Sequence, residues 1–456
     1  MERLRRKSKS ELKERVLQFG EGNFLRGFAD WMIDRLNNEC DWGGGVVVVQ
    51  PLPVGRIDNL NEQDGLYGLC LRGRVNGRPE EDISIIKSIV RGINPYKDFD
   101  KYMECAKNPD LRFIISNTTE AGIEYKENQS ENDFAGITFP ARLAIFLKAR
   151  FESGLGGFIF LPCELIDSNG DALKECILKY ARDWHYGSGF CEWLEKENYF
   201  ANTLVDRIVT GYPSDEAGEI QKRLGYTDTM LDTAEIYHLW VIQGNKEIAA
   251  EIPFHKTGLN VLWKEDIKPY KKRKVRILNG AHTMTVPAAL SAGFETVGEV
   301  MHDDTMLDFI KKGVFDEIIP TLDLPENELI EFADDVLQRF DNPFIKHYLT
   351  SIALNSVSKF RVRVLPSITE YIRIYDKEPK ILVFSLSAMI DFYKTSPQVN
   401  DDESVAEFMK NASVSDILKK EEYWGTDLSF LKNSVERYID MIKEKGIKKA
   451  IEITIG

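Results

Sequence analysis

The chain has 456 residues, of which 43% are hydrophobic, and it carries a formal net charge of −14 with an isoelectric point near 5.2. This length and hydrophobic content can fill two domain cores. The acidic balance argues against a protein that binds nucleic acid or anionic membranes over a broad surface, because such binding needs a positive face. We therefore expect a two-domain globular protein with neither nucleic acid nor a membrane among its partners.

The cysteines and the N-terminal segment indicate the compartment. The six cysteines occur singly, without a C-x-x-C pair of the kind that indicates a zinc site or a disulfide framework. The basic N-terminal segment is followed by too short an apolar stretch for a secretory signal. No segment approaches the ~20 apolar residues of a transmembrane helix. These features predict a cytoplasmic protein with reduced thiols and no structural metal.

The first half of the chain alternates between short apolar runs and helical patterns. The predicted strands are 15–19, 45–50, 111–117 and 156–162, and the predicted helices are 23–39, 140–153 and 171–184. Buried β-branched strands that alternate with helices are typical of a parallel sheet covered by helices. Helical periodicity dominates after about residue 265. We predict an α/β domain over residues 1–265 and a mainly α-helical domain over residues 266–456.

A glycine-rich loop follows the first predicted strand. Gly20 and Gly22 lie between that strand and the first predicted helix, where a dinucleotide fold places its pyrophosphate loop. The pattern continues to Gly27 as G-x-G-x-x-x-x-G, which departs from the usual G-x-G-x-x-G spacing. The alternative to a cofactor loop is an ordinary tight turn between the strand and the helix. The predicted cofactor-binding residues of this loop are Phe19, Gly20, Glu21, Gly22, Asn23 and Phe24.

The end of the second predicted strand leaves the cofactor type open. Gln50 stands where a ribose-binding Asp or Glu is expected in a dinucleotide fold. A carboxylate there would repel the 2′-phosphate of NADP, whereas a neutral glutamine favours neither NAD nor NADP. Arg56 is close enough in sequence to pair with a phosphate, and its alternative role is that of a solvated loop cation.

A second group of polar residues lies in "RKVRILNGAHT", residues 273–283. On a helix that advances about 100° per residue, Lys274, Asn279 and His282 point at about 0°, 140° and 80°, so one broad face can carry all three. A lysine in such a place can take the proton of a secondary alcohol as hydride leaves, while an asparagine amide holds the oxygen. The alternative is a solvated basic run followed by a helix end and a structural histidine.

This stretch resembles the K-x4-N-x2-H signature of the mannitol dehydrogenase family, the polyol-specific long-chain dehydrogenases and reductases. Further segments resemble the family in chain order: "FGEGNFLRGF", "SNTTEAG", "FANTLVDRIV", "HLWVIQG" and "QRFDNPFIKHYLTSIALNSVSKF". The resemblance implies a Rossmann-type domain that binds NAD, with NADP not excluded, a helical substrate domain, and hydride transfer without a metal.

The resemblance also implies roles for individual residues. Lys274 would be the general acid or base, Asn279 would stabilise the alkoxide with help from Asn169, and His282 would bind substrate hydroxyls. Asn169 has an alternative role as a helix N-cap. The remaining residues are Asn117, Thr118 and Glu120, which would bind the cofactor, and Asp206 and Arg207, which would lie near the substrate.

The C-terminal half departs from the polyol-specific members in one informative stretch. No arginine occurs between Asn342 and Lys359, where those members carry one. A sugar acid needs a cation for its carboxylate, and the candidates are Lys359 first and then Arg361 or Arg363. If residues 360–364 form a strand, the two arginines share one face, and a solvated edge is the alternative.

These observations lead to a functional hypothesis. The resemblance implies reversible reduction of a sugar acid with NADH, D-tagaturonate to D-altronate, as in hexuronate catabolism. The same chemistry would serve fructuronate, mannitol or mannitol phosphate. A protein of another class, a dinucleotide-binding sensor without turnover, is the remaining alternative, and the full Lys274, Asn279, His282 and Asn169 set argues against it. The pattern does not predict an oligomeric state.

Overall fold

The computed structural model describes residues 1–119 and 121–456, so Glu120, a predicted cofactor residue, lies outside the described residues. The described chain forms two compact units. Unit 1 comprises Met1–Arg72 and Glu81–Ile267, and unit 2 comprises Gly73–Glu80 and Lys268–Gly456. The short segment Gly73–Glu80 joins unit 2 although it lies far from it in sequence. Within the described part of the chain, no helix is long and apolar enough to cross a membrane.

Unit 1 is built on a six-stranded parallel sheet. Its strands are β2 (Lys13–Phe19), β3 (Gly44–Val49), β6 (Ile89–Ile93), β7 (Phe113–Ser116), β8 (Ile159–Pro162) and β9 (Tyr199–Phe200). The spatial order is β6-β3-β2-β7-β8-β9, and every pairing is parallel. The chain winds outward from β2 in one direction and then from β7 in the other. The carboxyl ends of β2 and β7 therefore form the switch point at which doubly wound sheets bind ligands.

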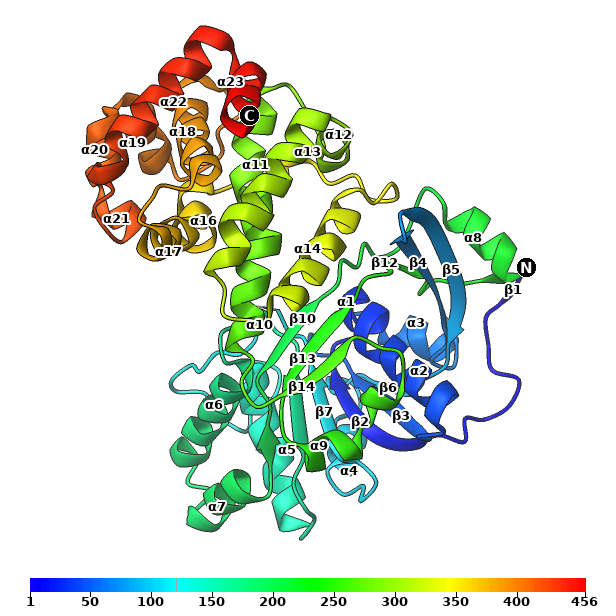
Figure 1. The fold of residues 1–456 in the computed structure, drawn as a ribbon. Helices are drawn as coiled ribbons and strands as arrows, with labels where there is room; N and C mark the ends of the chain where they lie inside the picture. Colours follow the sequence, from blue (N-terminus) through cyan, green and yellow to red (C-terminus); the bar gives the residue numbers. More distant parts are fainter. Residues whose placement is uncertain (120) are drawn as a thin grey trace. The chain divides into compact units, whose positions relative to one another are not determined.

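Helices cover both faces of this sheet (Figure 1). They are α1 (Asn23–Leu25), the π-helical turn η1 (Arg26–Asp30), α2 (Trp31–Cys40), α3 (Ile57–Glu62), α4 (Phe99–Cys105), α5 (Phe139–Glu152), α6 (Asn169–Asp183) and α7 (Ser188–Lys196). Neighbouring residues of β2 enter different cores, because side chains alternate along a strand. Val16 packs with Phe28 and Trp240 on one face. Leu17 packs with Phe146 of α5 on the other.

Unit 1 also contains three smaller sheets. They are β10-β13-β14, β12-β4-β5 and β1-β11. The strand bounds are β1 (Glu2–Arg3), β4 (Tyr67–Val75), β5 (Arg78–Ile86), β10 (Thr203–Asp206), β11 (Tyr226–Thr227), β12 (Asp232–Glu235), β13 (Leu239–Gln243) and β14 (Val261–Lys264). The end of β4, the turn after it and the start of β5, residues Gly73–Glu80, belong to unit 2. The short helices α8 (Ala217–Leu224), α9 (Lys246–Glu251) and η2 (Phe254–Lys256) complete unit 1.

Unit 2 is helical apart from the β4–β5 turn (Figure 1). Its helices are α10 (Lys268–Arg273), η3 (Lys274–Asn279), α11 (Gly280–Ser291), α12 (Val297–Met301), α13 (Asp304–Lys311), η4 (Lys312–Ile318), η5 (Ile319–Thr321), α14 (Glu326–Phe340), α15 (Leu349–Ile352), α16 (Ser356–Arg363), α17 (Leu365–Tyr375), α18 (Lys380–Thr395), α19 (Glu403–Asn411), α20 (Val414–Lys419), α21 (Glu421–Trp424), η6 (Ser429–Leu431), α22 (Lys432–Lys445) and α23 (Ile447–Ile455). The apolar helix α18 packs against α11 and α22 and is buried from Ile381 to Tyr393. The predicted fold class, an α/β domain followed by a mainly helical one, is confirmed.

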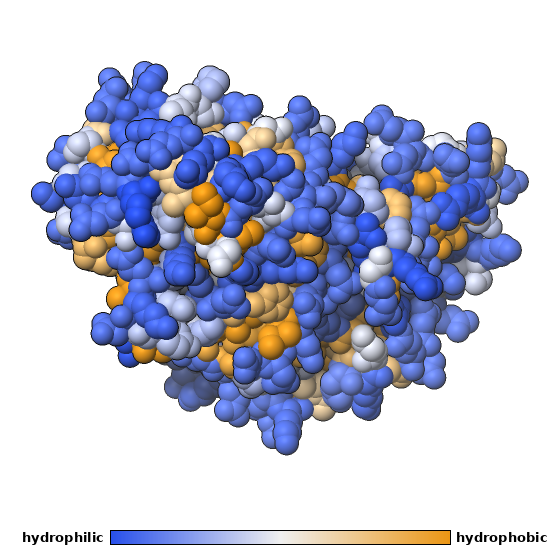
Figure 2. All heavy atoms as spheres, turned by 45° about the horizontal axis from the view of Figure 1, so that its top comes forward, coloured by the Kyte–Doolittle hydropathy of each residue, from blue (hydrophilic) through white to orange (hydrophobic). Residues whose placement is uncertain are grey.

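The surface agrees with the composition. Hydrophilic residues cover most of the face in Figure 2, and hydrophobic residues appear there in groups among them.

All six cysteines are free thiols, and Cys70, Cys105, Cys163 and Cys176 are buried.

Candidate functional site

The glycine loop turns sharply at the end of β2. Gly20 has a φ of +126°, and a side chain there would meet the carbonyl oxygen of Asn117 at 3.2 Å. Its N–H donates to the carbonyl of Val49 at 3.1 Å, which fastens the loop to the end of β3. A residue with a Cβ is strained at this φ, so the turn requires glycine. Gly22 precedes α1, and a Cβ there would have no atom within 4 Å, so its position is open.

A pocket of about 480 Å³ opens beside this loop. Its walls come from the ends of β2, β3 and β7 and from the start of α5, at the switch point of the sheet. Of the predicted cofactor residues, Gly20, Glu21, Gly22, Asn117 and Thr118 line it. Gly20 and Gly22 have no side chains, so a ligand can approach the backbone next to the start of α1, which is the arrangement that binds phosphate oxygens. The residues present therefore fit a dinucleotide.

Three other residues of the loop support it from outside the pocket. Phe19 is buried in the core beside Phe139, with ring centroids 5.1 Å apart. Asn23 accepts a hydrogen bond from the guanidinium of Arg26 at 2.6 Å. Phe24 stacks on Phe28 at 5.0 Å. These contacts fix the path of the loop, and they give these side chains a structural role.

Gln50 is turned away from the pocket. Its amide nitrogen donates to the carbonyls of Leu52 at 2.7 Å and Pro53 at 3.3 Å, and its oxygen accepts from Ile57 N–H at 3.4 Å. The side chain is buried and shapes the loop that follows β3. It therefore occupies the predicted sequence position without presenting a polar atom to a ribose.

Glu164, which the sequence pattern did not indicate, orders the loop after β7. Its carboxylate accepts hydrogen bonds from Ser116 Oγ, Thr118 N–H and Thr118 Oγ1, each at 3.0 Å. Burial raises the pKa of Glu164, and these hydrogen bonds oppose the rise. Glu164 follows β8 closely, and a carboxylate just past the end of a parallel strand is the signal that could have identified it.

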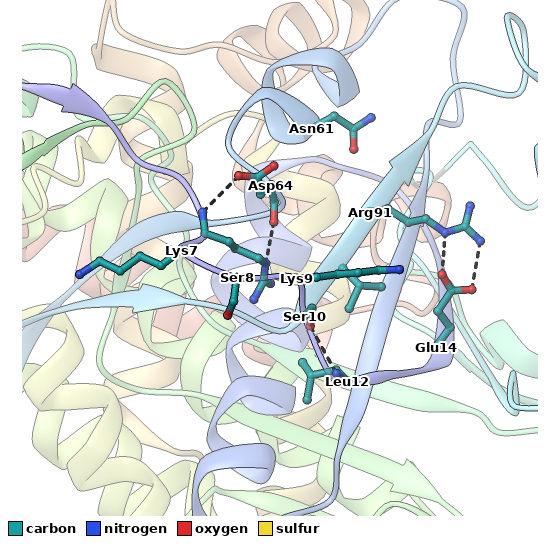
Figure 3. A pocket seen from close by; sticks show the side chains of 11 residues that line it. Lys7, Ser8, Lys9, Ser10, Leu12, Glu14, Asn61, Asp64 and Arg91 are labelled. Carbon is teal, nitrogen blue, oxygen red and sulfur yellow. Dashed lines mark hydrogen bonds and ion pairs between the residues drawn. The ribbon is translucent and has the colours of Figure 1, made fainter.

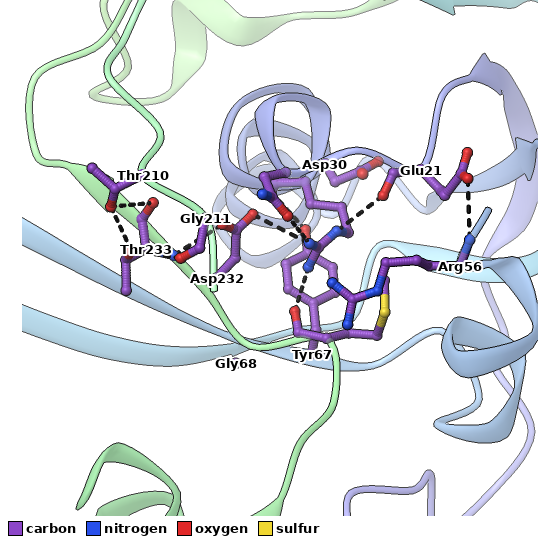
Figure 4. A network of polar contacts seen from close by, with 12 residues as sticks. Glu21, Asp30, Arg56, Tyr67, Gly68, Thr210, Gly211, Asp232 and Thr233 are labelled. Carbon is purple, nitrogen blue, oxygen red and sulfur yellow. Dashed lines mark hydrogen bonds and ion pairs between the residues drawn. The ribbon is translucent and has the colours of Figure 1, made fainter. Parts of the chain in front are cut away.

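Buried charges surround the first helical turn after the loop (Figure 4). Arg26 is buried, lies 3.8 Å from the carboxylate of Asp232, and donates to the carbonyls of Glu21 and Met230. Burial raises the pKa of Asp30 to about 7 and that of Asp232 to about 6. The phenol of Tyr67 donates to the Arg26 carbonyl at 2.6 Å. This network holds η1 in place behind the pocket.

The predicted substrate residues Asp206 and Arg207 lie in unit 1. Asp206 ends β10 and is buried. Arg207 is buried over the ring of Trp31, with its guanidinium carbon 4.1 Å from the ring centroid. It donates to the carbonyls of Gly27 at 2.9 Å and Glu235 at 2.8 Å, and burial lowers its pKa to about 9. In unit 1 the guanidinium thus supports η1 from a second side.

Asn169 is the first residue of α6, so the N-cap position belongs to Ser168 and the N-cap alternative is wrong. The amide nitrogen of Asn169 donates to the carbonyls of Pro162 at 3.0 Å and Glu164 at 3.1 Å. Its oxygen accepts from Thr203 N–H at 2.8 Å. The side chain is buried and joins the end of β8 to the start of β10, so both amide hydrogens serve the main chain in this arrangement.

In unit 2, Lys274 and Asn279 begin and end the π-helical turn η3, and His282 follows in the first turn of α11. The N–H of Gly280 donates to the carbonyl of Val275, five residues earlier. A π-turn winds more slowly than an α-turn, so residue i+5 returns closer to the face of residue i. The wide angle that a regular α-helix would place between Lys274 and Asn279 is therefore reduced. Such turns occur frequently at functional sites.

His282 lies in an aromatic setting. Its ring stacks on Phe340 with centroids 4.0 Å apart and meets the ring of His347 edge-on at 5.0 Å. Burial lowers the pKa of His282 well below its ordinary value, and the neighbouring His347, Arg339 and Arg363 lower it further. The imidazole is therefore neutral at neutral pH, with one nitrogen able to donate and the other able to accept a hydrogen bond.

The candidate carboxylate anchors lie on α16, so the strand interpretation of residues 360–364 is wrong. Val357, Phe360 and Val364 are buried at helical spacing, and their packing selects the helix. Lys359 and Arg363 share a face because they are four residues apart. Arg363 contacts Thr283 Oγ1 of α11 at 3.4 Å, whereas Arg361 donates to the Glu422 carbonyl of α21 at 3.2 Å. The two arginines therefore point in different directions.

A second pocket of unit 1 lies between the N-terminal segment and β6, with a volume of about 820 Å³ (Figure 3). Two arginines beside it form hydrogen bonds within its wall. Arg91 pairs with Glu14 at 2.6 Å, and Arg6 binds Asp64 through both its main chain and its guanidinium. Glu14 and Val90 of this wall lie near the amino ends of β2 and β6, whereas the glycine-loop pocket lies at the carboxyl ends of β2 and β7, so the glycine-loop pocket is the stronger cofactor site.

A doubly wound sheet with a glycine turn and a pocket at its switch point, followed by a helical domain, defines a two-domain dinucleotide-dependent oxidoreductase. Comparison with known families agrees: the Rossmann-domain model of mannitol dehydrogenases matches residues 14–256, and the C-terminal domain model matches residues 266–444. The chain belongs to the mannitol dehydrogenase family, as the sequence resemblance predicted.

Full-length relatives support the same assignment. The chain is 44% identical to an altronate oxidoreductase of Escherichia coli O17:K52:H18 and to one of Shigella flexneri, over 97% of each chain. Among solved structures it resembles a D-sorbitol dehydrogenase, with a TM-score of 0.85 and 21% identity over 97% of this chain and 95% of that one. It also resembles Pseudomonas fluorescens mannitol 2-dehydrogenase in complex with NAD and D-mannitol, with a TM-score of 0.70 and 20% identity over 99% and 96%. At these identities the two structures support the fold.

Proposed function

We propose that this chain reversibly reduces D-tagaturonate to D-altronate with NADH. The observation that carries the proposal is the 44% identity to altronate oxidoreductases over nearly the whole chain, together with the Lys274, Asn279 and His282 set on η3 and α11. The cytoplasm is the expected location, because six free thiols suit a reducing compartment.

The cofactor belongs in the pocket beside the glycine loop. Gly20, Gly22, Asn117 and Thr118 would hold it there, with Glu164 keeping the loop after β7 in shape. When bound, the nicotinamide supplies the hydride that the sugar carbonyl accepts. NADH is the proposed form of the cofactor, and NADPH is the alternative to be tested.

Residues of unit 2 transfer the proton and bind the substrate oxygens. Lys274 gives its Nζ proton to the carbonyl oxygen during reduction and takes it back during oxidation. Asn279 donates its amide N–H to the same oxygen while negative charge develops on it. The neutral imidazole of His282 binds a neighbouring hydroxyl. Asn169 is the predicted second amide for the oxygen, and this role requires its bonds to Pro162 and Glu164 to exchange.

The substrate carboxylate needs a cation, and α16 carries the candidates. Lys359 and Arg363 face one side of α16, and their partners are neutral: Lys359 Nζ donates to the carbonyl of Ile352 at 2.9 Å, and Arg363 contacts the Thr283 hydroxyl. Thr283 follows His282 directly in the chain. We therefore propose Arg363 and Lys359 as the carboxylate anchors, and His347 as a neutral neighbour of the substrate.

A substrate panel tests the function. The purified protein is assayed for NADH consumption with tagaturonate, fructuronate, fructose and fructose 6-phosphate, and each assay is repeated with NADPH. We expect turnover with tagaturonate and NADH to exceed the other combinations. Preference for fructuronate would keep the anion site and change the substrate. Preference for fructose or its phosphate would contradict the carboxylate anchors.

A further inference from the structure

The glycine loop itself carries a carboxylate, and its position bears on the choice between NADH and NADPH. In doubly wound folds, a carboxylate at the end of the second strand accepts hydrogen bonds from the adenosine ribose hydroxyls. Here β3 is that strand, and its end carries Gln50, whose amide is bound to its own loop. Gln50 thus occupies the position of the ribose-binding carboxylate, and its amide is bound to its own loop instead of facing the ribose.

Glu21 reaches the same place from the neighbouring strand. The ends of β2 and β3 are in register, Phe19 beside Val49, so the residues just beyond them lie side by side. The Glu21 carboxylate Oε1 accepts the N–H of Arg56 at 3.2 Å (Figure 4). A side chain at Gly55 would lie 2.1 Å from that oxygen and 2.6 Å from Gln50 Oε1. Gly55 thus leaves room for the side chains of both Glu21 and Gln50.

The carboxylate is available to a ligand. Glu21 lines the 480 Å³ pocket, and the hydrogen bond from the Arg56 N–H goes to its Oε1. Burial raises the pKa of the Glu21 carboxyl, and hydrogen bonds from the main-chain N–H groups of Glu21 and Arg56 oppose the rise. The cations of the same pocket are engaged elsewhere. Lys126 pairs with Glu124 at 3.3 Å, and Arg142 donates to the carbonyl of Ile137 at 2.9 Å and to that of Pro51 at 2.5 Å. Arg142 has neutral carbonyl partners and keeps its positive charge, and Glu21 places a negative charge at the ends of β2 and β3.

We propose that Glu21 is the residue that selects NADH over NADPH. Its Oε2 accepts a hydrogen bond from the adenosine ribose, and its charge repels a 2′-phosphate at the same position. The glycine loop then has two roles: its backbone binds the pyrophosphate, and the Glu21 carboxylate distinguishes a ribose hydroxyl from a 2′-phosphate. This inference rests on the dinucleotide site of the proposed function and does not depend on the sugar substrate.

Direct binding tests the proposal without a sugar. NADH and NADPH are titrated separately by cofactor fluorescence into the wild type, Glu21→Gln, Glu21→Asp and the control Glu62→Gln. Gln keeps an oxygen for the Arg56 N–H and removes the charge. Glu62 is an exposed carboxylate of α3 that pairs with Arg3, so its change alters net charge equally.

We expect the wild type to bind NADH at least tenfold more tightly than NADPH. Glu21→Gln should reduce this ratio at least tenfold, while Glu21→Asp and Glu62→Gln should retain it. The same ratio in Glu21→Gln as in the wild type, or equal binding of both cofactors by the wild type, would overturn the role of Glu21 and leave the sugar chemistry untouched. Failure of the wild type to bind either cofactor would overturn the dinucleotide site and the role of Glu21 together.

Discussion

The cations behind the glycine loop in unit 1 and the cations beside α11 in unit 2 have different partners. Arg26 and Arg207 are buried, lie near carboxylates, and donate to main-chain carbonyls. Lys359 and Arg363 are half-buried, and their hydrogen-bond partners are a carbonyl and a hydroxyl. A buried cation matched within its own domain fixes the backbone, because its charge is already compensated. A half-buried cation with neutral partners keeps its charge for an anionic ligand.

The largest effect should come from Lys274. Replacing it by alanine removes the proton donor, and general acid–base catalysis contributes roughly 10²–10⁴-fold, so kcat should fall by about 10³-fold. The NADH affinity, set by unit 1, should be unchanged in a fluorescence titration. Lys272→Ala is the control, because Lys272 pairs with Asp323 on the surface at 2.7 Å. Full activity of Lys274→Ala would contradict its role as the base.

The buried charges behind the glycine loop should affect the free energy of unfolding rather than the turnover number. The pKa of Asp30 is about 7 in the folded chain and 3.8 when exposed, so the folded state keeps a proton that the unfolded chain has released. The free energy of unfolding should therefore fall as pH rises from about 4 to about 7, by up to about 4 kcal/mol. Asp30→Asn should remove this fall, as measured by urea unfolding at pH 5 and pH 8. The exposed Asp58→Asn should keep it, and equal pH dependence in all three proteins would contradict a buried proton at Asp30.

The two arginines of α16 give a matched pair. A hydrogen bond between charged groups contributes about 1.5–3 kcal/mol, so Arg363→Ala should raise the KM for tagaturonate by roughly 10–100-fold. Arg361→Ala should leave it near the wild-type value, because Arg361 binds the Glu422 carbonyl. Steady-state kinetics measures both. If the two variants behave alike, the distinction between the two faces of α16 does not govern substrate binding.

The smallest effect should be that of Glu164→Gln. Glutamine has one acceptor oxygen where the carboxylate has two, so the bonds to Ser116 and Thr118 cannot all persist. The loop lining the pocket should loosen, and the Kd for NADH should rise about tenfold, a change of about 1.4 kcal/mol. The kcat at saturating NADH should change little, because Glu164 does not touch the proton path. A fall in kcat with unchanged NADH affinity would place Glu164 in the chemistry instead.

Local patterns predicted the parts of the fold that depend on nearby residues. The four apolar runs became β2, β3, β7 and β8 because each is buried on both faces of a parallel sheet, which demands continuous hydrophobicity. The helix over 140–153 became α5, Phe139–Glu152. The glycine turn followed from the left-handed φ that Gly20 adopts. In each case the signal lies within a few residues.

Partners distant in sequence decided the rest. The stretch 360–364 alternates like a strand, yet burial against α11 made it part of the helix α16. The roles of Gln50 and Asn169 depend on main-chain groups that only the folded chain brings to them. Glu21 meets Gly55 and Arg56 across two strands, 34 and 35 residues later in the chain. The sequence by itself determined the main strands of the parallel sheet and the family, because their signals reside in local residue order. Only the tertiary structure decided which polar side chains stay available to a ligand, because hydrogen bonds to distant backbone consume the others.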